Sequence, residues 1–255
     1  MNELIDMKIS GASTMPGGEY GRVSISGAGK IKGSVKCTAL SCSGSTSIEG
    51  NAMCSGSVHA SGSAKIAGDV FCAGEMQASG SFRCEGGVQA GSLHCSGATV
   101  IIGAAEADEI TAAGGTSARG LRCRILKASG GLRVEDGVEA ESARLSGSIT
   151  IPGLLNAERA EIYPSSGSHI GSIGGSDVRI LDGGTGRLFG FLPRSGTLIT
   201  VGTVEADTVE LECTEADVVR GRSVRIGKGC RVGRVEYSEK LTAEPGTVGE
   251  AVRCE

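Results

Sequence analysis

The chain has 255 residues with a formal net charge of −4, and 43 of the residues are glycine, whereas aromatic residues make up 3% and tryptophan is absent. This composition excludes a conventional globular core of large side chains, and five prolines without a Gly-x-y period exclude collagen. No Lys/Arg cluster carries stacking aromatics around it, so nucleic-acid binding is not expected.

Residues 1–20 are predicted to form an N-terminal tail and a first strand. The opening run Met1–Lys8 has neither a basic region nor a long apolar segment, so it does not read as a signal peptide. No stretch of the sequence approaches the roughly 20 apolar residues of a membrane-spanning helix. We therefore expect a cytoplasmic protein.

Residues 21–163 are predicted to form a regular β-helix, because glycines recur every six residues from Gly44 to Gly86. The residues four and two positions before each glycine are apolar or small, and those between them are mostly polar. This alternation places the apolar side chains on one face of a strand, and the glycine permits the corner that follows. The two columns are Thr46, Ala52, Val58, Ala64, Val70, Met76, Phe82 and Val88, and Ile48, Cys54, Ala60, Ile66, Cys72, Ala78 and Cys84.

A longer period overlies the first. Ser-Gly or Ala-Gly pairs recur every 16 to 18 residues, which is about three six-residue units. We therefore predict a β-solenoid of triangular cross-section with three short strands per turn, and about eight turns before the repeat breaks at Leu181. An isoleucine column has the same period, with Ile31, Ile48, Ile66, Cys84, Ile101, Ala118, Val134 and Ile151.

The regular pattern is interrupted in residues 164–195 and resumes in a second β-helix segment and C-terminal tail, residues 196–255, with about four turns. The interruption is sharpest at 181–194, where two of the four phenylalanines lie close together. One interpretation is that this loop packs against the solenoid; the other is that it docks on a membrane surface or a partner protein. The candidate contact residues are Leu188, Phe189, Phe191 and Leu192.

The ten cysteines form no Cys-x-x-Cys pair and have no histidine at a metal-site spacing. Cys37, Cys54 and Cys72 are predicted to be successive members of one core column, and Cys84 to replace isoleucine in another. Stacked strands about 4.8 Å apart would allow disulfides, but a reducing cytosol opposes them. We interpret the cysteines as small, reduced core residues.

Enzymatic alternatives find little support in the sequence. The left-handed β-helix of acyltransferases is also built on hexads and uses a histidine as general base. His59 and His94 occupy outward positions of the repeat, which leaves His169 as the one candidate. The segment Gly27–Lys30 lacks the spacing of a phosphate-binding loop, and the carboxylate clusters of polysaccharide lyases are missing. No catalytic, cofactor-binding or metal site is predicted.

Five segments carry a resemblance to a known family: Ile9–Ser13, Ser26–Gly33, Gly153–Glu158, Thr214–Gly221 and Val224–Ser238. They resemble the bactofilins, and most closely the long, two-segment polymer-forming cytoskeletal proteins of Gram-positive bacteria. The resemblance implies a right-handed β-helix that polymerises end to end into non-polar filaments without nucleotide. It also implies a scaffold role in cell shape, envelope synthesis or motility. The chain departs from the family in having many Cys and Ala residues in its core columns.

The ends of the repeat favour the same interpretation. The terminal turns of a solenoid expose apolar columns and unpaired strand edges, which natural repeat proteins usually cover with a polar cap or a helix. No amphipathic helix is predicted at either end. We therefore expect the chain to have itself as its main partner, in a homopolymer. A capped monomer, a small oligomer and a monomeric solenoid binding module remain the alternatives.

Overall fold

The computed structural model of the protein describes residues 4–183 and 197–254, and within these residues it contains strands and turns but no helix. The strands pair in parallel and form a β-solenoid with about 14 turns in all. The chain divides into two compact units, unit 1 (Met1–Arg124) and unit 2 (Ile125–Glu255).

Unit 1 is built mostly from short strands, because a corner follows every few residues. Its strands are β1 (Met7–Ile9), β2 (Ala12–Glu19), β3 (Arg22–Ile25), β4 (Ala28–Cys37), β5 (Ala39–Cys42), β6 (Ser45–Ile48), β7 (Ala52–Cys54), β8 (Val58–Ala60), β9 (Ser63–Ile66), β10 (Val70–Ala78), β11 (Ser81–Cys84), β12 (Val88–Cys95) and β13 (Ala98–Ala112).

The strands that follow are longer, because the pairing with neighbouring strands continues through the corners. The 50-residue β14 begins in unit 1 and ends in unit 2. The strands are β14 (Gly115–Pro164), β15 (Ser168–Ile180), β16 (Ile199–Leu211), β17 (Thr214–Ile226), β18 (Arg231–Ala243) and β19 (Val248–Arg253).

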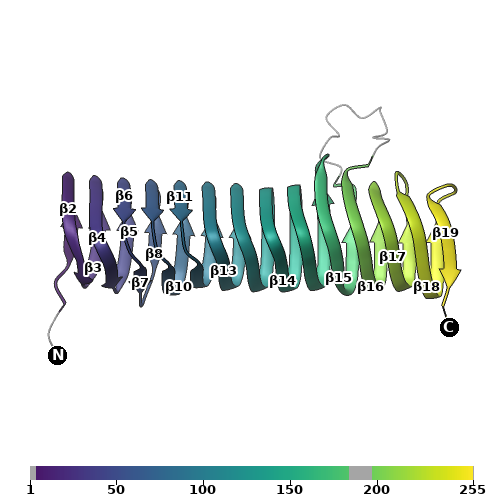
Figure 1. The fold of residues 1–255 in the computed structure, drawn as a ribbon, viewed down its shortest axis with the longest axis horizontal. Helices are drawn as coiled ribbons and strands as arrows, with labels where there is room; N and C mark the ends of the chain where they lie inside the picture. The colour runs from purple at the N-terminus through teal and green to yellow at the C-terminus, as the bar shows by residue number, and fades with distance from the viewer. Residues whose placement is uncertain (1–3, 184–196, 255) are drawn as a thin grey trace. The chain divides into compact units, whose positions relative to one another are not determined.

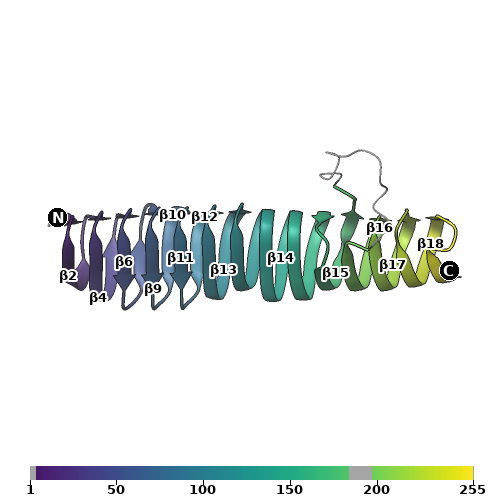
Figure 2. The ribbon, with the colours of Figure 1, turned by 90° about the horizontal axis from the view of Figure 1, so that it is seen from above.

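Within each unit, successive turns lie side by side with like positions in register (Figures 1 and 2). In unit 1, β5 and β6 pair in parallel with β8 and β9, and β7 pairs with the first part of β10. Ile48 is thereby aligned with Ile31 on one side and Ile66 on the other. In unit 2, β16 has β15 and β17 as neighbours.

The two apolar columns that the six-residue pattern predicts are confirmed as the core of unit 1. Every member from Thr46 to Val88 is buried, while the residues between them are mostly exposed. Because the side chains are small or branched, the core needs few aromatic rings. Phe82 is the exception, and it is buried between the smaller Ala64 and Thr99 of the neighbouring turns.

The corner glycines allow neighbouring turns to approach closely. A Cβ atom added to Gly44 would overlap the carbonyl oxygen of Gly27 in the preceding turn, and one added to Gly62 would overlap the carbonyl oxygen of Gly44. A side chain at these corners would push the turns apart, which explains why glycine recurs there.

The structure has about 14 turns, more than the roughly twelve (eight and four) that the repeat indicates. One additional turn lies in the N-terminal segment, where Met15 is aligned with Ile31. Another contains Ile170, which is aligned with Ile151. Both turns have looser glycine spacing, so the strict repeat does not register them.

Eight of the ten cysteines are buried. The predicted column is confirmed, because Cys54 is aligned with Cys37 and with Cys72. Cys84 also lies in the isoleucine column, between Ile66 and Ile101. The interpretation as core residues fails for two cysteines: Cys123 is half-buried, and Cys254 is exposed beyond the last strand.

Candidate assembly interface

The last turn of unit 2 leaves inward-facing column positions uncovered. Val232 on β18 is 1% exposed, whereas Val248, which is aligned with it on β19, is only half-buried. Val235 is likewise buried, but its partner Ala251 is exposed. Each buried member has a turn on both sides, while Val248 and Ala251 have one neighbouring turn among the described residues.

The second half of β18 shows the same feature. The strand pair between β18 and β19 covers residues 232–237 of β18 and leaves the following residues without a strand above them among residues 197–254. Leu241 is therefore half-buried and Ala243 exposed, although their partners Val224 and Ile226 are both buried. The described end of unit 2 is thus a stepped edge with open backbone groups and uncovered apolar side chains, to which another strand could add.

The first turn of unit 1 is open in part. Within the described part of the chain, β1 and β2 pair along one edge only, with β3 and β4. Met15 is half-buried, although its partner Ile31 is fully buried. Met7 and Ile9 are already buried by the strands that follow. This edge is therefore open mainly along β2.

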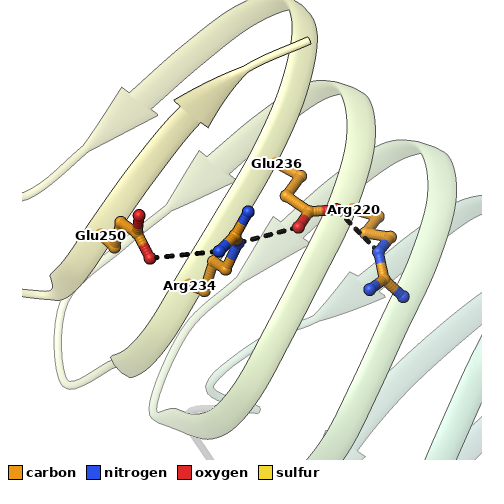
Figure 3. Close-up of polar contacts among 4 residues, drawn as sticks. All are labelled: Arg220, Arg234, Glu236 and Glu250. Atoms are coloured by element: carbon orange, nitrogen blue, oxygen red, sulfur yellow. Dashed lines mark hydrogen bonds and ion pairs between the residues drawn. The ribbon is translucent and has the colours of Figure 1, made fainter.

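A ladder of alternating charges follows the outer surface of the last turns of unit 2 (Figure 3). The Arg220 Nε donates to a Glu236 carboxylate oxygen at 2.8 Å, and the Arg234 Nε donates to the other oxygen at 2.8 Å. Arg234 also contacts Glu250 on β19, with 3.4 Å between Nη1 and Oε2. The guanidinium of Arg220 holds the pKa of Glu236 below its usual value.

The ladder follows the register of the strands, because Arg220 is aligned with Glu236 and Arg234 with Glu250. A shift by one residue would break both pairs. Such exposed pairs add little stability, but like charges placed directly opposite are unfavourable. The ladder therefore favours one register of stacking over its neighbours.

The three histidines lie at outward-facing strand positions. His59 and His94 both lie on the outer surface of unit 1, where the His59 Nδ1 is 3.2 Å from the amide oxygen of Gln77. His169 in unit 2 is exposed between the buried Ser168 and Ile170. Across residues 4–183 and 197–254, no three His, Cys, Asp or Glu side chains are grouped so that they could hold a metal ion.

The predicted contact residues of the interrupting loop lie outside the described residues. β15 ends at Ile180 and β16 begins at Ile199, and Leu188, Phe189, Phe191 and Leu192 lie in the part of the sequence between these strands that is not described.

In the described part of the chain, no helix has the length and apolarity needed to span a membrane.

Unit 1 carries an exposed apolar pair that was not predicted from the sequence. Met53 is 41% exposed and Phe71 45% exposed, and the two residues are aligned on β7 and β10. Both interrupt the alternation, since they occupy outward positions that elsewhere carry polar residues. An apolar residue at an outward position was therefore the sequence signal from which this exposed pair could have been predicted. They border a surface hollow of about 260 Å³, whose lining also includes Leu4, Tyr20 and the two cysteines Cys37 and Cys54.

Two Bacillus subtilis (strain 168) proteins are similar to parts of the chain. The protein named Uncharacterized protein YhbF is 38% identical over 78 residues, which is 31% of this chain and 31% of the relative. Uncharacterized protein YhbE is 35% identical over 94 residues, or 36% of this chain and 39% of the relative. The chain thus spans about a third of the length of these relatives. No family model and no solved structure matches it.

Proposed function

We propose that the chain is a bactofilin-like cytoskeletal scaffold that assembles end to end with copies of itself into filaments, without nucleotide. The observation that carries this proposal is the uncovered column at the described end of unit 2, where Ala243 and Ala251 are exposed although their partners one turn earlier are buried. Stacking another turn there would bury these side chains and pair the open strand edge.

The handedness and the cross-section of the solenoid are part of the same proposal. A triangular cross-section fits the three strand segments that recur in each turn of unit 1, and the right-handed path is what the resemblance to the bactofilins implies. The filament would serve as a scaffold for cell shape, envelope synthesis or motility in the cytoplasm. The loop residues Leu188, Phe189, Phe191 and Leu192 would contact the membrane surface or an envelope or motility protein. The proposal assigns the chain no enzymatic activity, no cofactor and no nucleic-acid partner.

Negative-stain electron microscopy of the full chain without nucleotide tests the assembly directly. Thin unbranched filaments are the expected result. Compact, dispersed particles at every concentration would rule the filament out.

A matched pair of substitutions tests whether the uncovered column forms the contact. Ala243→Glu places a charge in the column that another turn would bury, whereas Thr242→Glu places the same charge on the exposed outer side, aligned with Arg225. Both residues are exposed, so both variants are expected to keep the far-UV circular dichroism of the parent. Filaments should be lost in the first variant and retained in the second. Equal assembly by both would place the contact elsewhere.

A further inference from the structure

Two cysteine side chains touch inside unit 1. Cys37 on β4 and Cys54 on β7 are aligned in the strand pair, and their Sγ atoms are 3.2 Å apart. Their exposed fractions are 4% and 0%. Neighbouring strands lie about 4.8 Å apart, which is within the Cα separation that a disulfide accepts. The spacing of the turns is therefore compatible with a disulfide between the two residues.

The contact is specific to this pair in the cysteine column. Cys72 is aligned with Cys54 on the other side, but its thiol donates to the carbonyl oxygens of Gly56, at 3.1 Å, and Glu75, at 3.3 Å. Its sulfur is thereby engaged with the backbone. Of the two neighbouring pairs in this column, Cys37 and Cys54 are the pair whose sulfur atoms are in contact.

The pair also borders the surface hollow beside Met53 and Phe71, which has a volume of about 260 Å³. A water molecule takes up about 30 Å³ in the liquid, and hydrogen peroxide is only slightly larger, so the hollow admits an oxidant of that size. Cys37 and Cys54 are the two cysteines in the lining of this hollow, and their side chains are buried in the columns like most of the other cysteines.

The hydrogen bond between the two thiols lowers the pKa of Cys37 and raises that of Cys54. A Cys54 S–H that donates to the Cys37 sulfur stabilises the Cys37 thiolate, so Cys37 is the thiol of the pair that ionises first. Burial instead raises the pKa of Cys42, to about 11, and that of Cys84, to about 11. Since the thiolate is the reactive form, the direction of this shift favours attack on a peroxide by Cys37 over attack by Cys42 or Cys84.

We propose that Cys37 and Cys54 form an oxidation-sensitive pair, which a small peroxide converts to a disulfide between neighbouring turns of unit 1. The Cys37 sulfur attacks one peroxide oxygen; the O–O bond breaks, one water leaves, and Cys37 becomes a sulfenic acid. The Cys54 sulfur then attacks the Cys37 sulfur; the S–O bond breaks and a second water leaves. The two thiols lose two protons and two electrons, and the peroxide is reduced to two waters.

Peptide mapping of the full chain tests the pair. A Cys254→Ser background removes the exposed thiol. The folded protein is treated with hydrogen peroxide, and free thiols are counted after unfolding; the count is expected to fall by two. Digestion with trypsin and a glutamate-specific protease separates residues 37–49 from 50–65, so the disulfide appears as these two peptides joined with two hydrogens lost. Fragmentation of the joined peptides distinguishes Cys37 from Cys42.

Two variants test which cysteines form the disulfide. Cys37→Ala is expected to abolish the joined peptide, and Cys72→Ala, in the same column, to leave it unchanged. The mapping on the parent stands even if one variant fails to fold. A link from Cys54 to Cys42 or Cys72 in comparable amount, or an unchanged thiol count while the protein stays folded, would overturn the proposal.

Discussion

Arg220 and Glu236 occupy the same position of neighbouring turns, and the arginine Nε lies 2.8 Å from the carboxylate. Both side chains lie on the outer surface, where solvent screens the attraction. The pair therefore contributes to the register of the strands more than to stability, because it is formed only when β17 and β18 are in the observed register. If one strand slipped by two residues, its apolar side chains would still face the core, because their period is two. The charged residues of the ladder would then lose their partners, so the ladder tolerates such a slip less readily.

The first prediction concerns the pH dependence of this pair. The pKa of Glu236 is lowered chiefly by its hydrogen bond to Arg220. A carboxyl group whose pKa is lower in the folded state stabilises the fold above its unfolded pKa of about 4.3, and this stabilisation is lost as the pH falls through the folded value. Arg220→Gln should therefore raise the pKa of Glu236 in an NMR titration of the carboxyl carbon.

Arg234 still contacts Glu236 in that variant, so the pKa should remain partly lowered. Arg253→Gln is the matched control, since Arg253 bonds to the Ser238 carbonyl and not to Glu236. An equal pKa change in both variants would mean that net charge, rather than the contact, sets the value.

The second prediction concerns the corner glycines. Gly44→Ala would drive the new Cβ into the Gly27 carbonyl oxygen, and backbone cannot yield as a flexible side chain does. Overpacking of this kind should lower the free energy of unfolding by about 1–3 kcal/mol. Gly115→Ala is the control, because nothing lies within 4 Å of its added Cβ. Urea unfolding followed by circular dichroism checks both, and equal losses would show that crowding is not the reason for glycine at position 44.

The period of the sequence was enough to predict the β-solenoid and its core. The positions two and four residues before each glycine are all buried, from Thr46 to Cys84, because strict alternation leaves only one way to hide the apolar side chains. The alignment of Cys37 with Cys54 also followed from the period alone.

Other features depended on three-dimensional detail that a period does not contain. That Cys37 contacts Cys54 while Cys72 bonds to the backbone depends on side-chain rotamers. The exposure of Ala251 depends on which strands cover β19. The turn count was too low because Met15 lies in a turn whose glycines depart from the six-residue spacing.

The third prediction compares two phenylalanines of unit 1. Phe82 is 2% exposed and fits the core because Ala64 and Thr99 of the adjacent turns are small. Phe82→Ala leaves a cavity that alanine and threonine cannot fill, so the free energy of unfolding should fall by about 3–5 kcal/mol.

Phe71 provides the matched control, since Phe71→Ala makes the same chemical change at a side chain that is 45% exposed. It lies on the outer side of β10, and surface changes usually alter the free energy of unfolding by about 0.5 kcal/mol or less. The two variants should therefore separate clearly in urea unfolding followed by circular dichroism. Comparable losses would show that Phe71 packs against the rim of the hollow as firmly as Phe82 packs in the core. A small loss at Phe82 would instead mean that the narrow core can close around a missing ring, which close-packed columns are not expected to do.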